Sequence, residues 1–191
     1  ASNFIRSGQA EMQEIMERAS RVRLLLMDVD GVLTDGKLYN VPDPRGGVFE
    51  TKAFDSQDGI ALQWLSWMGI QTGLISGRVS PATEERARQC HFTYVYQGHI
   101  EKIPVFEEIL KQSGLSPAEV AYAGDDLTDV VVMRRVGLAI ATANARPEVK
   151  QCAHLVTSQE GGRGAIREVA ELLLRAHGRW EELLRKYEVT R

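Results

Sequence analysis

The sequence predicts an α/β fold built on a mainly parallel sheet. Short apolar runs that end in polar residues recur along the chain, beginning with "LLLM" at 24–27 and returning as "VAYAG" at 120–124. Segments with helical spacing of apolar residues separate these runs. Strands and helices that alternate in this way pack helices on both faces of a parallel sheet, with right-handed crossovers between strands.

Turn and capping residues bound the predicted elements. The helix that follows Ser80 has Pro81 at its first position, and a later helix ends at Gly114. In chain order we expect a helix over 9–20, a strand over 24–27, a helix over 59–69, a strand ending at 76, a helix over 81–90, a strand over 94–98, a helix over 102–113, a strand over 120–124, a helix over 129–137, strands over 138–141 and 154–157, a helix over 164–177 and a polar tail over 178–191.

Residues 35–58 interrupt the alternation. "GKLYNV" and "GVFETKAF" flank the turn-rich "PDPRGG", which predicts a β-hairpin arm. A lone hairpin is marginal in water and exposes unpaired strand edges. The arm is therefore expected to pack either on its own domain or on a neighbouring subunit, and the physics alone favours neither.

Composition limits the classes of function. The 191 residues fit one domain, and the net charge of −3 provides no basic field for nucleic acid or an anionic membrane, so we expect neither partner. Cys90 and Cys152 have no metal-binding spacing and suit a reducing cytosol, with a single disulfide as the alternative. The sequence shows no membrane-length apolar run and no signal peptide, so we expect a cytoplasmic location.

Polar residues stand at the ends of several predicted strands. In open parallel sheets the ligand site lies beyond the carboxyl ends of the strands, so these residues should meet in one crevice. Helix capping would explain a single aspartate, but a shared Mg²⁺ explains four of them more economically. The residues are Asp28, Asp30, Ser76, Asp125 and Asp126.

Such a cluster suits phosphoryl transfer. One aspartate can attack phosphorus and form an aspartyl phosphate that water later cleaves. A second can serve as acid and then as base. A serine hydroxyl, backbone N–H groups and a lysine can hold the phosphoryl oxygens, while a metal neutralises their charge.

The motifs resemble those of the haloacid dehalogenase superfamily of phosphatases. "DVDGVLT" is similar to its first motif, Ser76 in "LISGR" to its second, Lys102 to its third and "GDDLTD" at 124–129 to its fourth. Together with the hairpin, "F-x-x-x-DG" at 54–59 and "GGRGAIREV" at 161–169, they resemble the 3-deoxy-D-manno-octulosonate 8-phosphate (KDO 8-phosphate) phosphatase family. The resemblance implies a Rossmann-like core without a large cap domain, Mg²⁺ dependence, and a homotetramer assembled through the hairpin.

The resemblance also implies residue roles. Asp28 would be the nucleophile and a metal ligand, Asp30 the acid/base and a metal ligand through its carbonyl, and Asp125 the third metal ligand, with Asp126 and Asp129 supporting. Ser76 and Lys102 would hold the phosphoryl group. Substrate contacts are expected from Thr34, which would also brace the first loop, and from Asp58, Gly77, Arg78 and Arg163.

One departure leaves the substrate open. Gln57 stands where many members of the family carry a basic residue. We expect hydrolysis of KDO 8-phosphate for lipopolysaccharide synthesis, with a nine-carbon sugar acid phosphate as the alternative substrate. A non-catalytic tetramerisation module and a phospho-accepting receiver domain are the competing classes. The tail, with Trp180 and Tyr187, is expected to cover a neighbouring active site or to dock on the surface.

Overall fold

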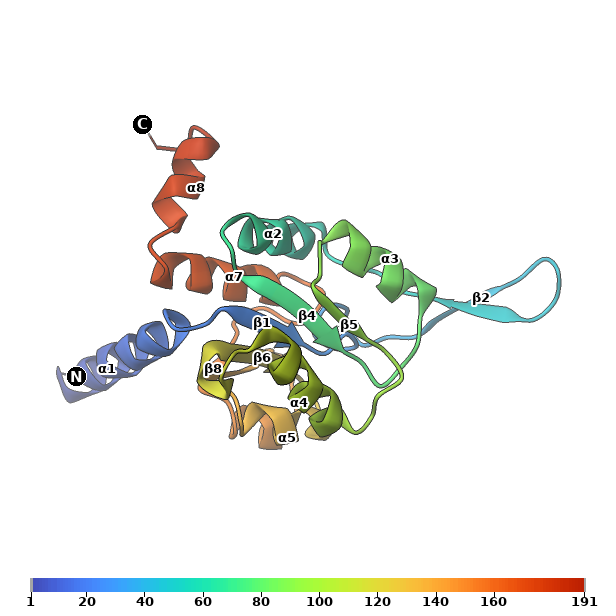
Figure 1. Ribbon diagram of the computed structural model, residues 1–191, viewed down its shortest axis with the longest axis horizontal. Coiled ribbons are helices and arrows are strands. Elements are labelled where there is room, and N and C mark those ends of the chain that lie inside the picture. The colour runs from blue at the N-terminus through green and yellow to red at the C-terminus, as the bar shows by residue number, and fades with distance from the viewer. Residues whose placement is uncertain (1, 191) are drawn as a thin grey trace.

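A six-stranded parallel sheet forms the centre of the protein. The computed structural model describes residues 2–190 (Figure 1). The strand order is β5-β4-β1-β6-β7-β8, and every neighbouring pair is parallel. The strands are β1 Leu24–Met27, β4 Gln71–Ile75, β5 Tyr94–Tyr96, β6 Val120–Gly124, β7 Leu138–Ala141 and β8 Leu155–Val156. The predicted α/β class is confirmed.

The strand order reverses at β1. The chain first adds β4 and β5 on one side of β1 and then crosses to add β6, β7 and β8 on the other. A crevice forms beyond the carboxyl ends of the strands at such a switch point. Residues that follow β1, β4 and β6 are therefore brought together there.

Helices cover both faces of the sheet, and each face has its own hydrophobic core. Because side chains alternate along a strand, Leu25 and Met27 pack into one core, with α2 and α7, while Leu24 and Leu26 pack into the other, with α4 and α5. The helices are α1 Ser2–Ala19, α2 Ser56–Trp67, α3 Pro81–Gln89, α4 Lys102–Ser113, α5 Leu127–Met133, α6 Pro147–Lys150, α7 Ala165–Ala176 and α8 Trp180–Lys186, with a 3₁₀ turn at Pro117–Glu119.

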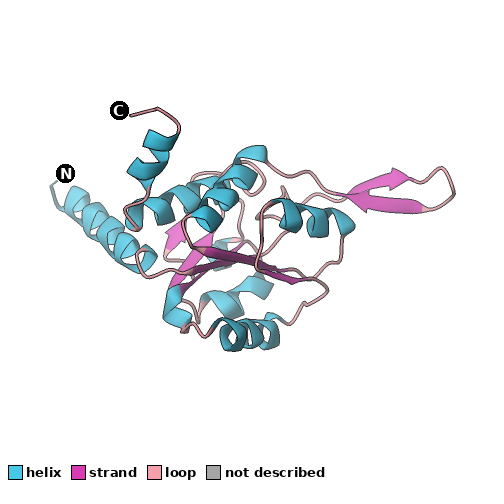
Figure 2. Ribbon diagram, turned by 45° about the horizontal axis from the view of Figure 1, so that its top comes forward, coloured by secondary structure: helices cyan, strands magenta, loops and turns pink. Residues whose placement is uncertain are grey.

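The segment after β1 is a hairpin, as predicted. Strands β2 Tyr39–Pro42 and β3 Val48–Thr51 pair antiparallel and stand clear of the core in both views (Figures 1 and 2). The arm ends earlier than position 58, because the side chain of Asp55 accepts hydrogen bonds from the backbone N–H groups of Gln57 and Asp58 and starts α2 at Ser56. No large cap domain is present among the described residues.

The C-terminal tail contains a helix that the sequence did not predict. Helix α8 packs on α7, and Leu183 on it is buried in the core. The ring of Trp180 meets that of Trp64 on α2 edge-on, with 6.4 Å between centroids, and the Tyr187 hydroxyl accepts a 3.0 Å hydrogen bond from Trp64 Nε1. The tail therefore docks on its own domain, at the end of the molecule away from the arm (Figure 1).

The structure also bears on the predicted cysteine state and on membrane-spanning segments. Cys90 and Cys152 are both free thiols, so the disulfide alternative is wrong. Among residues 2–190, no helix combines the length and the apolar character required to cross a membrane.

Candidate active site

A cavity of about 490 Å³ opens at the carboxyl ends of the strands, at the predicted switch point. Asp28 and Asp30 reach it from the loop after β1, and Gly77 and Arg78 from the loop after β4. The other predicted residues that line it are Lys102, at the start of α4, and Asp125 and Asp126, after β6. The fold thus brings together residues nearly one hundred positions apart, as the motifs predicted.

Lys102 is a buried cation at the base of this cavity. Its Nζ lies 2.7 Å from Asp129 Oδ1, 3.2 Å from Asp28 Oδ1 and 3.0 Å from the Tyr122 hydroxyl. Burial disfavours the charged amine, but the charges of Asp129 and Asp28 outweigh burial and raise the pKa of Lys102. Lys102 therefore stays protonated beside Asp28.

Asp129 organises the loop after β6. Its Oδ2 accepts hydrogen bonds from the backbone N–H groups of Asp125 (2.9 Å) and Asp126 (3.2 Å), and its Oδ1 accepts from Tyr122 and Lys102. Because every contact is short and the side chain is fully buried, Asp129 holds the positions of the other acids. Tyr122, which completes this network, was not predicted; it lies inside an apolar strand and carries no motif.

The carboxylates of Asp28 and Asp125 face each other with few partners. Oxygen atoms of Asp28, Asp125 and Asp129 lie within 4.8 Å of one another, and Asp125 Oδ1 is buried without a hydrogen bond. Burial, followed by the charge of Asp129, raises the pKa of Asp28 to about 6 and that of Asp125 to about 8. Crowded oxygen donors with suppressed ionisation fit a hard divalent cation, since the cation would offset their repulsion.

Gly31 allows this close approach. Its φ is +84°, and a Cβ built on it would lie 2.0 Å from Asp125 Oδ2. A larger residue would push Asp125 out of the site and would also be strained in this left-handed conformation. The glycine of the first motif is therefore required by both the turn and the neighbouring acid.

The first loop is braced from behind. Thr34 is buried, and its Oγ1 accepts from the Gly36 N–H at 3.1 Å. Asn144 donates to the Gly31 carbonyl at 2.9 Å and accepts from the Gly161 N–H at 2.7 Å. A Cβ on Gly161 would lie 2.0 Å from that same carbonyl oxygen. The glycine-rich segment therefore packs its backbone against the loop that carries Asp28.

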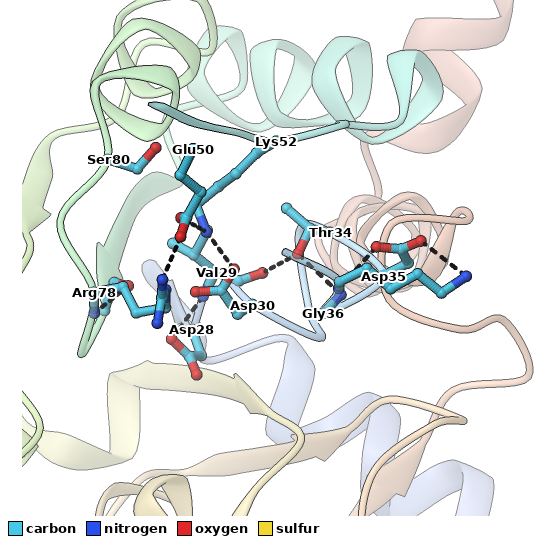
Figure 3. Close-up of polar contacts among 12 residues, drawn as sticks. Asp28, Val29, Asp30, Thr34, Asp35, Gly36, Glu50, Lys52, Arg78 and Ser80 are labelled. Atoms are coloured by element: carbon cyan, nitrogen blue, oxygen red, sulfur yellow. Dashed lines mark hydrogen bonds and ion pairs between the residues drawn. The ribbon is translucent and has the colours of Figure 1, made fainter. Parts of the chain in front are cut away.

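The base of the arm reaches the mouth of the cavity (Figure 3). Lys52, just after β3, forms an ion pair with Asp30 and lies 3.3 Å from Glu50 Oε1. Glu50 in turn pairs with Arg78, and that hydrogen bond holds the pKa of Glu50 below its usual value. Neither Lys52 nor Glu50 belongs to one of the motifs, so the sequence offered no signal for this chain of contacts.

Ser76, Asp58 and Arg163 are placed differently. Ser76 directly follows β4 and is buried, with its Oγ accepting from the Arg78 N–H at 3.2 Å. Asp58 is buried at the start of α2, where it accepts from the Arg167 N–H at 2.7 Å, and burial raises its pKa to about 6. Arg163 is exposed and borders a separate cavity of about 430 Å³. None of Ser76, Asp58 and Arg163 is among the residues that line the cavity that holds Asp28.

Comparison with known proteins agrees with this geometry. Residues 57–168 match the haloacid dehalogenase-like hydrolase family. The chain is 40% identical over 169 residues to the 3-deoxy-D-manno-octulosonate 8-phosphate phosphatase KdsC of Escherichia coli strain K12, which covers 88% of each protein.

Solved structures agree as well. The Yersinia pestis 3-deoxy-D-manno-octulosonate 8-phosphate phosphatase is 41% identical, with a TM-score of 0.83 and coverage of 88% of this chain and 89% of that one. The enzyme from Moraxella catarrhalis, solved with magnesium, phosphate and KDO, is 35% identical, with a TM-score of 0.87 and coverage of 92% and 99%.

The fold and the site therefore define a hydrolase of the haloacid dehalogenase class, with aspartates and a serine after parallel strands and a lysine at the start of a helix. Within that class, the chain belongs to the KDO 8-phosphate phosphatase family, a family of phosphoric monoester hydrolases.

Proposed function

We propose that the protein is a Mg²⁺-dependent phosphatase that hydrolyses KDO 8-phosphate to KDO and phosphate through an aspartyl phosphate. The observation that carries the proposal is the position of Asp28, which shares one cavity with Asp125 and lies 3.2 Å from a buried, protonated Lys102. The activity of the relatives and the phosphate and KDO bound to the Moraxella catarrhalis enzyme support the substrate.

Asp28 is the proposed nucleophile. A carboxylate oxygen of Asp28 bonds to phosphorus while the bond from phosphorus to the sugar oxygen breaks. Water then attacks the aspartyl phosphate and releases phosphate, which regenerates Asp28. The Val29 N–H donates to Asp28 Oδ1 at 2.7 Å, and this contact helps to orient the carboxylate.

Lys102, Ser76 and the Gly77 backbone are proposed to hold the phosphoryl oxygens. Asp28, Asp125 and the Asp30 carbonyl would hold Mg²⁺, which supplies charge neutralisation for the transferring group. Asp126 and Asp129 support these ligands, since Asp126 caps α5 and Asp129 binds the loop. The charge of Lys102 favours an ionised nucleophile.

Asp30 is the proposed acid/base. It gives a proton to the leaving sugar oxygen in the first step and takes one from water in the second. The sugar acid is expected to contact Arg78 at the mouth of the cavity, because Arg78 is half-exposed there. We assign no substrate contact to three of the predicted residues. Thr34 and Asp58 are buried and bind backbone N–H groups. Arg163 borders a separate cavity.

The arm is the proposed assembly surface of a cytoplasmic homotetramer that serves lipopolysaccharide synthesis. In this proposal, residues 1–191 form one phosphatase domain, with the segment from position 35 to the start of α2 at Ser56 as its oligomerisation arm and 178–191 as its tail. Exposed apolar side chains on the arm support this role, since the described residues leave more than a third of each one open to solvent. They include Leu38, Tyr39, Val41, Val48 and Phe49.

A substrate panel tests the function. We expect phosphate release from KDO 8-phosphate that requires Mg²⁺ and exceeds release from nine-carbon sugar acid 9-phosphates. In Asp28→Asn the rate should fall by roughly 10³-fold or more, as on loss of other nucleophiles, with an unchanged circular dichroism spectrum. Glu85→Gln, on the exposed face of α3, is the matched control and should retain full activity.

Other outcomes separate the alternatives. Faster turnover of a nine-carbon substrate would assign the protein to that sugar. A stable tetramer with no phosphate release from any substrate would indicate a non-catalytic assembly module. A phosphoaspartate that persists after treatment with acetyl phosphate would indicate a receiver domain.

A further inference from the structure

Lys52, at the base of the arm, has a buried side chain that pairs with Asp30, one of the acids that line the cavity. Its side chain is 1% exposed, and its Nζ is paired with Asp30 on one side and with Glu50 Oε1, at 3.3 Å, on the other. Lys52 directly follows β3, at the point where the arm rejoins the core. Figure 3 shows its side chain extending from this segment toward Asp30.

A buried ammonium requires partners, because its desolvation is costly. Here the partners come from two different parts of the chain: Asp30 from the loop after β1, and Glu50 from the arm. Glu50 is itself held by Arg78, which follows β4. The contacts therefore form a chain, from Arg78 through Glu50 and Lys52 to Asp30.

The consequence concerns the orientation of Asp30. The Asp28 side chain has two partners, since its Oδ1 accepts from the Val29 N–H and pairs with Lys102. Among the described residues, Lys52 is the single hydrogen-bond partner of the Asp30 side chain. A carboxyl that must transfer a proton loses efficiency when it is misplaced by about 1 Å. The ammonium of Lys52 is thus placed to set the direction of the Asp30 carboxyl.

We propose that Lys52 is a positioning residue for the proton transfer by Asp30. Through Lys52, the position of the arm relative to the core would affect the rate of the chemical step. This inference rests on the proposed phosphatase function. It assigns to the arm a contribution within its own subunit, in addition to assembly.

The chemistry supplies a selective readout. When the phosphorus–oxygen bond of a sugar phosphate breaks, the leaving oxygen keeps the bonding electron pair and takes the proton from Asp30. Without that proton an alkoxide would leave, which is unfavourable. The leaving group of p-nitrophenyl phosphate departs as a stabilised anion and needs no proton. Misplacement of Asp30 should therefore slow the first substrate far more than the second.

The experiment compares kcat and KM of Lys52→Met with those of the wild type for both substrates, at saturating Mg²⁺. For KDO 8-phosphate we expect kcat to fall by roughly 10²-fold with little change in KM, and for p-nitrophenyl phosphate by less than about 10-fold. Lys52→Arg should recover part of the loss. Asp30→Asn should show the same selectivity, and adding Lys52→Met to it should cause little further loss.

Lys37→Met is the matched control. Lys37 lies just before β2, where the chain enters the arm. Its side chain is 68% exposed and pairs at 3.6 Å with Asp35. Its replacement should leave both substrates unaffected. Should Lys52→Met fail to fold, as judged by circular dichroism, Lys52→Gln repeats the comparison with a polar side chain.

Three results would overturn the inference. An equal loss with both substrates would mean that Lys52 only stabilises the structure. A higher KM for KDO 8-phosphate with unchanged kcat would make Lys52 a substrate contact. Wild-type rates in the variant would remove any role. If the wild type itself hydrolyses neither substrate, the proposed function fails, and the inference fails with it.

Discussion

Three carboxylates crowd around one lysine in the cavity. Asp28, Asp125 and Asp129 have oxygen atoms within 4.8 Å of one another, and Lys102 offsets part of their charge. Because Asp129 is already bound by Lys102, Tyr122 and two backbone N–H groups, the unrelieved repulsion falls on Asp28 and Asp125. Burial, followed by the charge of Asp129, raises the pKa values of both carboxyls.

This charge balance predicts a pH-dependent response to Mg²⁺. The folded, metal-free protein binds protons at Asp28 and Asp125 more tightly than the unfolded chain, so these groups lower its stability as pH rises from 3.8 toward about 8. Mg²⁺ binds the ionised carboxylates and competes with the protons. The increase in melting temperature on adding Mg²⁺, measured by calorimetry, should be larger above pH 8 than below pH 6.

Asp125→Asn provides the control for this experiment. The variant should lose the Mg²⁺-dependent increase, and above pH 8 its metal-free form should melt no lower than the metal-free wild type, because the repelling carboxylate is gone. The same increase on both sides of the pH range would contradict the account of the charges.

At the scale of elements, the C-terminal tail is held in place by the helices beside it. Helix α8 is short and would be unstable alone, so its structure depends on contacts with α2 and α7. The Arg175 guanidinium lies 4.4 Å from the Trp180 ring centroid, and the Arg167 guanidinium 4.2 Å from that of Trp64. Alternating aromatic rings and guanidinium groups thus fasten the tail.

Trp180→Ala should weaken this attachment. We expect a loss of about 1–3 kcal/mol in the free energy of unfolding, measured by urea denaturation, because a half-buried indole and its stacking partners are lost. Activity should change little. Trp67→Ala is the matched control. It removes an exposed ring that lies under the Lys186 ammonium, and it should cost under about 1 kcal/mol. Lost activity with unchanged stability would instead favour a tail that covers a neighbouring site.

At the scale of the whole molecule, the arm stands clear of the core (Figure 1) and carries exposed apolar side chains. A two-stranded sheet is marginal in water, and the exposed side chains of Val48 and Phe49 add apolar surface to it. At the base of the arm, Lys52 nevertheless forms an ion pair with Asp30 in the loop after β1. The arm is therefore suited to link the assembly of subunits with the arrangement of the active site.

Phe49→Asp should disrupt the proposed homotetramer. Placing a charge in an apolar contact costs several kcal/mol unless it is paired, so sedimentation should show monomers or dimers in place of tetramers. Arg45→Ala changes a fully exposed side chain at the turn and should leave the assembly intact. A tetrameric Phe49→Asp protein would place the interface elsewhere.

Local patterns were sufficient for much of the fold and the site. The run Leu24–Met27 is the predicted strand, and Lys102–Ser113 the predicted helix, because periodicity and caps act between near neighbours. The rule that strand ends converge predicted that Asp28, Asp30 and Asp125 would meet, and the family resemblance added Lys102 to them. Gln57 marks the limit of this approach, since its identity alone says nothing about which substrate group it would meet.

The sequence by itself therefore determined the sheet, the edge at which the acids gather and the chemical class of the residues there. The tertiary structure decided which groups meet: Lys52 with Asp30, Tyr122 with Asp129, the Gly161 backbone with the Gly31 carbonyl, and Trp180 with Trp64. The physical reason is that hydrophobic periodicity reports only which face of an element is buried. The partner of a buried charge or ring depends on how separate elements pack, and packing is a property of the whole chain.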